Sequence, residues 1–249
     1  MSAGNIQWVV RGSDTRGDPQ MTERYAYGDS ERVELDQFIP ASAKKVLDVG
    51  CWQGGFGAAL KRRRPECVVW GIESDRESAA VAATRLDRVI NGCFPEEMVA
   101  DEHFDLVVFL DVLEHLVDPW NALRQASSLL RPGGVVVASI PNVRHVSVTF
   151  PLLARGLWEY KDEGHLDRTH LRFFTRRSME ILFRSSGYEV ERIEAINLRD
   201  GKTGAILRLG GRLAEEFRAG QYAVVARPKL RPTGSSDDRN DGQTEQPVG

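Results

Sequence analysis

The chain has 249 residues and a formal net charge of −3, with 41% hydrophobic and 28% charged residues. These values fit one globular α/β domain and provide no overall electrostatic attraction for nucleic acid. Residues 1–20 lack the apolar run of a signal peptide, and no segment approaches the ~20 apolar residues that a membrane span needs. The three cysteines lack the spacing of metal ligands, and their odd number argues against a disulfide framework. We therefore expect a cytoplasmic protein without a membrane span.

Strand and helix signals alternate from residue 45 to residue 140, which is typical of a parallel sheet with right-handed crossovers. Residues 104–110 form a continuous apolar run, the pattern of a strand buried on both faces. Asp118 and Pro119 predict the start of a helix, and the Gly-rich residues 131–134 break it. The predicted strands are 45–49, 68–72, 89–91, 104–110 and 135–140, and the predicted helices are 54–63, 76–86 and 119–130.

Residues 142–174 carry aromatic, histidine and arginine side chains without a clear period. A loop of that length inside a compact domain is usually functional, so we interpret residues 142–175 as an insertion on the substrate side. Regular signals then return. The remaining predicted elements are a helix from a Thr175 cap to residue 186, a strand at 188–197, a helix through Ile206, Leu209, Leu213 and Phe217, and a last strand at 222–226.

The predicted domain spans residues 21–227 and contains no internal repeat. We expect residues 1–20 to form a flexible segment before it. Residues 228–249 hold almost no bulky apolar side chains. Such a segment cannot bury enough surface to offset the entropy of ordering, so we predict a disordered tail.

A glycine-rich turn after the first predicted strand provides a candidate nucleotide site. Gly50 and Gly54 lie in this turn, where the missing side chains let the backbone approach a ligand. Ligands of doubly wound sheets bind outside the carboxyl ends of the strands. Glu73 ends the next predicted strand, where an acid can accept hydrogen bonds from ribose hydroxyls. Trp52 interrupts the glycine order that binds a pyrophosphate, so a dinucleotide-dependent dehydrogenase fits less well.

Residues 48–54, 104–119 and 130–141 resemble three sequence motifs of the class I methyltransferases that depend on S-adenosylmethionine. The resemblance extends from about Tyr25 to Ala226. It implies an α/β, Rossmann-like, doubly wound fold, with a seven-stranded, mostly parallel sheet and an antiparallel last strand. It also implies S-adenosylmethionine as the cofactor.

The resemblance further assigns the cofactor contacts. Gly50 and Gly54 would hold the methionine portion, Glu73 the ribose, and residues 92–94 the adenine. The full implied set is Asp48, Gly50, Cys51, Trp52, Gly54, Glu73, Ser74, Gly92, Cys93, Phe94, Leu110 and Asp111. The chain departs from the family pattern twice, because Trp52 replaces the central glycine of the turn and Cys93 replaces an acid that contacts the adenine amino group. Backbone groups can carry both contacts.

Acids and histidines gather just after the fourth predicted strand. Asp111, Glu114 and His115 have the spacing i, i+3 and i+4, which places them on one face of a helical turn. With His170 from the insertion they form a candidate site for Mg²⁺ or Mn²⁺. The arrangement resembles ubiquinone-pathway O-methyltransferases and small-RNA 2′-O-methyltransferases, although Asp111 is shorter than their glutamate. The alternative is a site without metal, in which His170 or His165 is the general base.

The insertion resembles methyltransferases of bacterial glycan and secondary-metabolite pathways, so we predict O-methylation of a sugar, glycan or small-metabolite hydroxyl. Trp158 and Tyr160 would stack on a sugar ring or plug a lid. The alternative functions are RNA 2′-O-methylation, N-methylation of an amino sugar, and an inactive cofactor-binding scaffold. We expect no nucleic-acid partner, and the oligomeric state stays open. The arginines Arg168, Arg172, Arg176 and Arg177 form either a phosphate-binding cluster or a solvated helix start.

Overall fold

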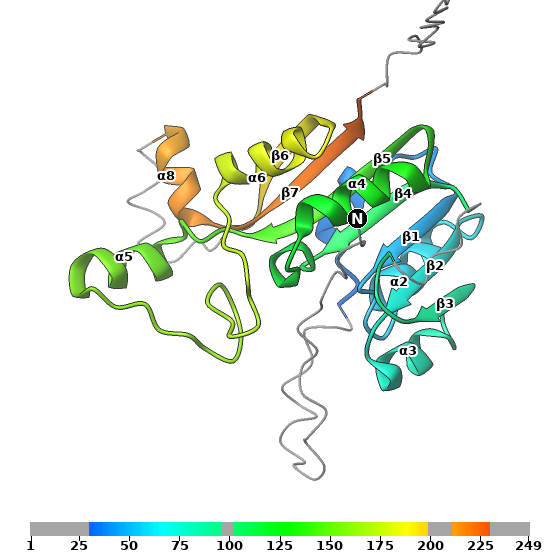
Figure 1. The fold of residues 1–249 in the computed structure, drawn as a ribbon, viewed down its shortest axis with the longest axis horizontal. Helices are drawn as coiled ribbons and strands as arrows, with labels where there is room; N and C mark the ends of the chain where they lie inside the picture. The colour runs from blue at the N-terminus through cyan, green and yellow to red at the C-terminus, as the bar shows by residue number, and fades with distance from the viewer. Residues whose placement is uncertain (1–29, 96–101, 199–210, 230–249) are drawn as a thin grey trace, which may run out of the picture.

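A computed structural model describes residues 30–95, 102–198 and 211–229. One mixed sheet of seven strands organises them, in the order β3-β2-β1-β4-β5-β7-β6 (Figure 1). The neighbours from β3 to β5 pair in parallel, whereas β7 is antiparallel to both β5 and β6. This confirms the predicted sheet and its antiparallel last strand. The strands are β1 (Lys45–Val49), β2 (Val68–Glu73), β3 (Arg88–Asn91), β4 (Phe104–Leu110), β5 (Leu130–Pro141), β6 (Tyr188–Leu198) and β7 (Ala219–Pro228).

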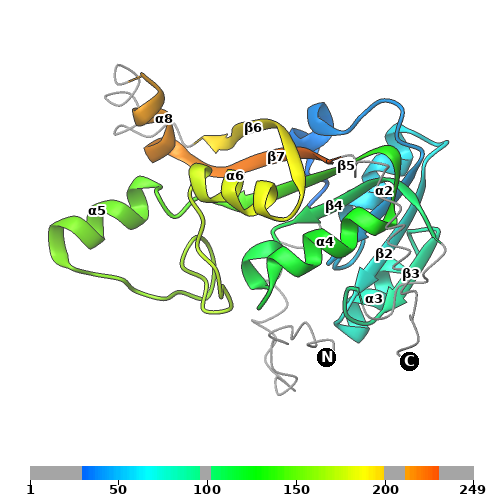
Figure 2. The ribbon, with the colours of Figure 1, turned by 45° about the horizontal axis from the view of Figure 1, so that its top comes forward.

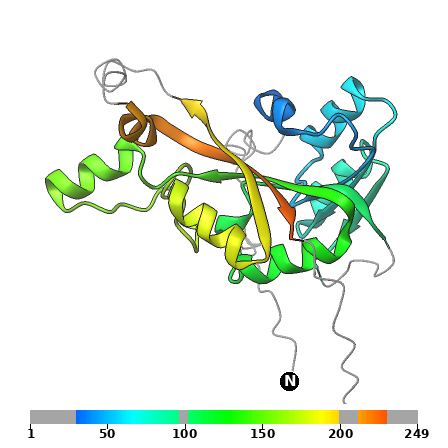
Figure 3. The ribbon, with the colours of Figure 1, turned by 90° about the horizontal axis from the view of Figure 1, so that it is seen from above.

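Helical segments cover both faces of the sheet. The helices are η1 (Val33–Phe38), α2 (Gly55–Arg63), α3 (Arg76–Ala82), η2 (Leu113–His115), α4 (Pro119–Leu129), α5 (Val146–Arg155), α6 (Arg176–Ser185) and α8 (Gly211–Arg218). One core lies between the sheet and α4 and α6, and a second lies beneath η1 and α2. Figure 3 shows the sheet between these two layers. Among the described residues, no helix has the length and apolar composition of a membrane span.

Polar caps fix where α4 and α6 begin. The Asp118 side chain accepts a hydrogen bond from the Asn121 amide with Pro119 at the first helical position, and Thr175 forms a capping box with Ser178. Helix α3 ends at Ala82, before the predicted residue 86. The reason is Asp87, whose amide and carboxylate both bond to the backbone of Val69 and direct the chain into β3.

Two further predictions need correction. Strand β5 begins at Leu130 rather than at residue 135, because the Gly-rich segment enters the sheet through a register shift opposite β4. The region predicted to be irregular contains α5, which His145 caps and Gly156 ends in the left-handed region. Its β-branched residues and Pro151 concealed the helical period. Ile206, Leu209, residues 1–20 and nearly all of the predicted tail lie outside the described residues, as does the Leu213 side chain.

The insertion extends beyond the end of the sheet. Helices α5 and α8 project past β5 and β7, and residues 156–175, here called the strap, run back from α5 toward the sheet (Figures 1 and 2). A bridge between Lys161 and Asp167 folds the strap on itself, and a bridge between Asn142 and Phe174 attaches it to the end of β5. The second bridge therefore holds the strap against the sheet.

A glycine in β2 permits the close packing of the cofactor turn. A Cβ atom at Gly71 would lie 2.5 Å from Cys51 Sγ and 2.9 Å from Leu86 Cδ1. We expect Gly71→Ala to lower the free energy of unfolding by ~1–3 kcal/mol, measured by urea denaturation, because the core is overpacked. Adding Cys51→Ala should restore part of this loss. Strictly additive effects of the two substitutions would contradict the proposed contact.

Candidate active site

The turn after β1 lies at the carboxyl edge of the sheet and contains two glycines in the left-handed region. Gly50 has φ 70° and Gly54 has φ 79°. A Cβ atom at Gly50 would lie 2.7 Å from Val112 Cγ2, so only glycine fits there. Trp52 adopts φ 49°, an uncommon conformation for a large side chain. The predicted cofactor turn thus has the geometry that a close backbone approach requires.

Glu73 is oriented by the same turn. Its carboxylate, 8% exposed, accepts hydrogen bonds from the Trp52 amide at 2.9 Å and the Asp75 amide at 2.8 Å, and from the Ser74 hydroxyl at 3.3 Å. Burial raises the pKa of Glu73, while these three hydrogen bonds oppose the rise. An acid held in this way at the end of β2 is in the place predicted for ribose recognition.

Asp48 is a second buried acid at this edge. It is 2% exposed, and burial together with the charge of Glu73 raises its pKa to about 8, opposed by Arg32. A cationic ligand at this edge would compensate the cost of ionising these carboxylates. S-adenosylmethionine carries a sulfonium and an ammonium group, so its charge matches the edge.

Arg32 is a residue of this edge that the sequence did not indicate. Its guanidinium donates to Asp111 at 2.5 Å and to Ser139 at 3.0 Å, and its backbone is left-handed with φ 48°. Gln221 from β7 donates to the same Asp111 carboxylate at 2.8 Å. These partners lie 79 to 110 residues apart in the chain, so no local pattern could reveal the network.

The predicted adenine segment follows β3. The Gly92 amide donates to the Glu73 carbonyl at 2.9 Å, which attaches this segment to the ribose acid. Phe94 is fully buried against Phe109, with ring centroids 5.7 Å apart, whereas Cys93 is half-buried. The backbone and Cys93 therefore face the edge more directly than the Phe94 ring. Leu110, the last residue of β4, is half-buried.

Glu114, His115 and His170 form a compact cluster at the end of β4. Each offers one ligand atom, and these atoms lie within 4.8 Å of one another. The His115 and His170 rings meet edge to face at 4.7 Å. The Glu114 carbonyl accepts hydrogen bonds from the Leu171 and Arg172 amides, at 2.9 and 3.0 Å, so the strap delivers His170 to η2. The predicted association between the Glu-His pair and the insertion is present.

The Glu114 carboxylate is the most unusual group in the cluster. It is 1% exposed, and neither oxygen reaches a hydrogen-bond partner in the part of the chain that the structure describes. Burial raises its pKa well above the ordinary value, and the charge of Asp111 adds to the rise. A buried carboxylate without partners is costly unless a cation or a proton compensates it. The donor set of one carboxylate and two imidazoles therefore fits a divalent cation.

Backbone carbonyls orient both imidazoles. His115 Nδ1 lies 3.2 Å from the Thr169 carbonyl, and His170 Nδ1 lies 3.2 Å from the His165 carbonyl. A carbonyl only accepts, so these contacts favour a proton on Nδ1 and leave Nε2 as the basic nitrogen of each ring. Carbonyl contacts of this kind are typical of metal-bound histidines.

Two predicted site residues lie apart from the cluster. Asp111, proposed as a metal ligand, is outside the group of three, and its carboxylate instead pairs with Arg32. His165, proposed as a base, places Nε2 2.9 Å from the Gly220 carbonyl and stacks on His145 at 4.7 Å and 5°. Since its own carbonyl contacts His170, the geometry favours a positioning role for His165.

The predicted basic cluster is divided between different contacts. Arg168 pairs with Asp162 at 3.4 Å, with both side chains largely exposed. Arg172 donates to the Val117 carbonyl at 2.6 Å and lies over the Trp120 ring. The described contacts do not converge on a phosphate-sized site, which favours the interpretation as a solvated segment.

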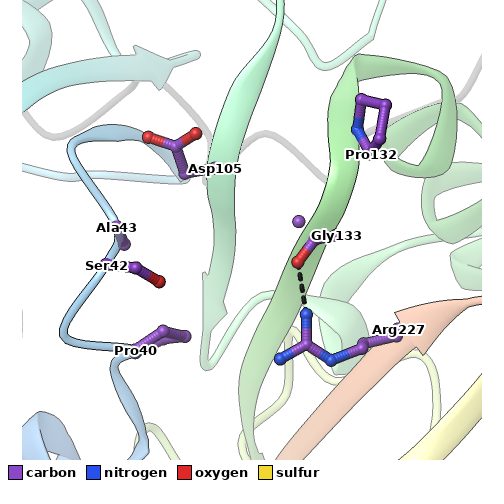
Figure 4. Close-up of a pocket in the computed structure, with 8 residues that line it drawn as sticks. Pro40, Ser42, Ala43, Asp105, Pro132, Gly133 and Arg227 are labelled. Carbon is purple, nitrogen blue, oxygen red and sulfur yellow. Dashed lines mark hydrogen bonds between the residues drawn. The ribbon is translucent and has the colours of Figure 1, made fainter.

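A small hollow of about 170 Å³ lies at the opposite, amino-terminal end of the strands. Figure 4 shows Asp105 on one side of it and Arg227, bonded to the Gly133 carbonyl, on the other. Asp105 already accepts hydrogen bonds from the Lys44 and Lys45 amides. Ligands of parallel sheets bind at the carboxyl ends, so this hollow does not belong to the candidate active site.

Comparison with known families agrees with this geometry. A family model described as a methyltransferase domain matches residues 24–193. The chain belongs to this methyltransferase family. The match confirms the predicted class, the methyltransferases that use S-adenosylmethionine as their cofactor.

Relatives of known name are ubiquinone biosynthesis O-methyltransferases. The protein from Stutzerimonas stutzeri (strain A1501) is 32% identical over 145 residues, which cover 51% of this chain and 61% of that protein. The protein from Pseudomonas aeruginosa (strain LESB58) is 34% identical over 117 residues, covering 43% and 49%. The chain thus matches between about half and three-fifths of the length of these relatives.

Solved structures share the fold. A SAM-dependent methyltransferase from Archaeoglobus fulgidus superposes with a TM-score of 0.60 at 17% identity, covering 84% of this chain and 99% of that one. The plantazolicin methyltransferase BpumL, solved in complex with SAH, gives a TM-score of 0.58 at 15% identity, with coverages of 86% and 92%. At identities this low, the similarity to these structures shows a shared fold and nothing further.

The raised pKa of Asp48 makes stability depend on pH. Between the ordinary pKa of an aspartate and about 8, the folded chain keeps a proton on Asp48 that the unfolded chain loses. The bound proton therefore favours the folded state at low pH. As the pH rises toward 8, the free energy of unfolding falls by at most ~1.4 kcal/mol per pH unit. In urea titrations of the ligand-free protein from pH 4 to 8, Asp48→Asn should therefore gain stability relative to the parent. Parallel pH profiles of the two proteins would contradict the burial of Asp48 as an acid.

Proposed function

We propose that the protein O-methylates a hydroxyl group of a small molecule, a sugar or glycan or a small secondary metabolite, with a divalent cation at Glu114, His115 and His170. The observation that carries the proposal is the buried Glu114 carboxylate, which has no hydrogen-bond partner among the described residues and lies beside two oriented imidazoles. The names of the relatives, ubiquinone biosynthesis O-methyltransferases, support oxygen as the acceptor atom. The cytoplasmic location expected from the composition is part of the same proposal.

The site divides the work between two neighbouring groups of residues. S-adenosylmethionine supplies an electrophilic methyl group, and Mg²⁺ or Mn²⁺ supplies a charge that lowers the pKa of a bound hydroxyl. The turn at Gly50 and Gly54, together with Glu73, orients the cofactor. Glu114, His115 and His170 would hold the cation. Arg32 and Gln221 keep Asp111 at the boundary between the two groups.

His170 is also the best base if no cation takes part. Its Nδ1 contact with the His165 carbonyl favours a basic Nε2, which can accept the proton that the hydroxyl loses. His165 would then position His170 rather than take the proton. RNA 2′-O-methylation, N-methylation of an amino sugar and an inactive scaffold are the competing functions, and each gives a different result in the assays below.

A thermal-stability experiment tests the cation site without any acceptor. In EDTA, Glu114→Gln should make the thermal stability less dependent on pH than in the parent, because it removes an acid whose ionisation burial disfavours. With Mn²⁺ at about 100 times its dissociation constant, the parent should gain ~2.7 kcal/mol, and the variant should gain little. Asp111→Asn is the matched control and should keep the Mn²⁺ response. A parent protein that Mn²⁺ does not stabilise would exclude the cation site.

Methyl transfer tests the reaction. Labelled S-adenosylmethionine is incubated with cell extracts and the enzyme, with EDTA or with added Mg²⁺ or Mn²⁺. We expect label in a hydroxyl of a sugar, glycan or small-metabolite fraction, lost with EDTA and restored by either cation. Label that persists in EDTA would indicate that His170, and not a cation, removes the proton of the hydroxyl. Label in RNA or on an amine would replace the proposed acceptor. No label in any fraction would favour the inactive scaffold.

A further inference from the structure

Aromatic rings of the strap form a continuous surface that begins at the candidate cation site. The Phe173 ring lies 6.3 Å from the His170 ring, 5.2 Å from Trp158 and 6.3 Å from Tyr160. Tyr160 is 48% exposed, and Trp158 and Phe173 are half-buried. We call Trp158, Tyr160 and Phe173 the aromatic wall.

The backbone holds the Phe173 part of this wall in a fixed place. On one side of Phe173, the Arg172 amide donates to the Glu114 carbonyl at 3.0 Å. On the other side, Phe174 is buried in the core, and its carbonyl accepts a hydrogen bond from the Val143 amide at 2.8 Å. Neighbouring side chains of an extended segment point in opposite directions, so burial of Phe174 directs Phe173 away from the core. These bonds fix the position of Phe173, and the Trp158 and Tyr160 rings pack against it.

The position of the wall determines what it can contact. The acceptor hydroxyl reacts beside Glu114, His115 and His170. The rest of the acceptor molecule must then lie against a neighbouring surface of the protein. The Phe173 ring adjoins His170 directly, so the wall is such a surface. Aromatic side chains bind flat apolar faces, including other aromatic rings. A six-membered acceptor ring with the reacting hydroxyl at its edge would reach both the wall and the cluster.

We infer that Trp158, Tyr160 and Phe173 form the subsite for the ring of the acceptor, an inference that rests on the proposed function. This subsite selects a ring that has an apolar face beside its reacting hydroxyl. A phenolic ring and the CH face of a pyranose share this chemistry. The wall acts in binding and not in the transfer itself. Its loss should therefore raise KM and the acceptor Kd, with much smaller changes in kcat and in the affinity for the cofactor.

The test uses two probes, catechol and methyl α-glucopyranoside, in the presence of S-adenosylhomocysteine and Mg²⁺. Saturation-transfer NMR and titration give the Kd of each probe. We expect ring protons of at least one probe to receive saturation, and Trp158→Leu or Phe173→Leu to weaken its binding roughly tenfold. Tyr160→Phe keeps the ring and should bind nearly as the parent does. Preference for catechol identifies a phenolic acceptor, and preference for the glucoside identifies a sugar.

Phe150→Leu is the matched control, because Phe150 is a 60% exposed aromatic residue on α5 and not part of the wall. It should leave both probes unaffected. Unchanged S-adenosylhomocysteine affinity and thermal stability would show that the Trp158 and Phe173 variants are folded. Binding that survives both substitutions, or a parent protein that binds neither probe, would overturn the subsite. The Mn²⁺ stability experiment is independent of these results, so failure of the subsite is distinguishable from failure of the proposed function.

Discussion

One backbone carbonyl connects the fold to the chemistry. The Glu114 carbonyl accepts hydrogen bonds from both the Leu171 and the Arg172 amides, and it thereby joins the turn after β4 to the strap. This contact brings His170 beside Glu114 and His115, and it also places Phe173 next to His170. Without it, the sheet would still offer a cofactor edge, but the cluster would lack its third member. The rest of the active site depends on this junction.

The carboxyl edge of the sheet has an electrostatic character that follows from burial. Asp48, Glu73 and Glu114 are each less than 10% exposed, and burial raises the pKa of all three. Arg32 lies among them, but it already pairs with Asp111. Positive charge is thus what this edge accommodates best. Both ligands assigned to it, a sulfonium cofactor and the proposed divalent cation, carry such charge, so one physical property links the family assignment to the cation proposal.

The sequence predicted the elements whose signals are local. The apolar run at residues 104–110, the caps at Asp118 and Thr175, and the glycine turn at Gly50 all have the predicted structure. Helix α5 was missed because its β-branched residues and Pro151 hide the period. The sequence indicated only a helix break at residues 131–134, because the register shift that brings this Gly-rich segment into β5 depends on pairing with β4. Local signals describe elements, whereas pairing partners decide how far each one extends.

The candidate site divides in the same way. The spacing of Glu114 and His115 in the sequence predicted that they share a site, and the resemblance to known families indicated His170 as a further member. The sequence could not show that Asp111 pairs with Arg32, because that ion pair joins residues 79 positions apart. The most direct test is anomalous diffraction from crystals of the full chain soaked with Mn²⁺ and S-adenosylhomocysteine. A manganese peak bounded by a Glu114 carboxylate oxygen and Nε2 of His115 and His170 is expected, whereas a peak elsewhere, or no peak here at saturating Mn²⁺, would contradict the cation site.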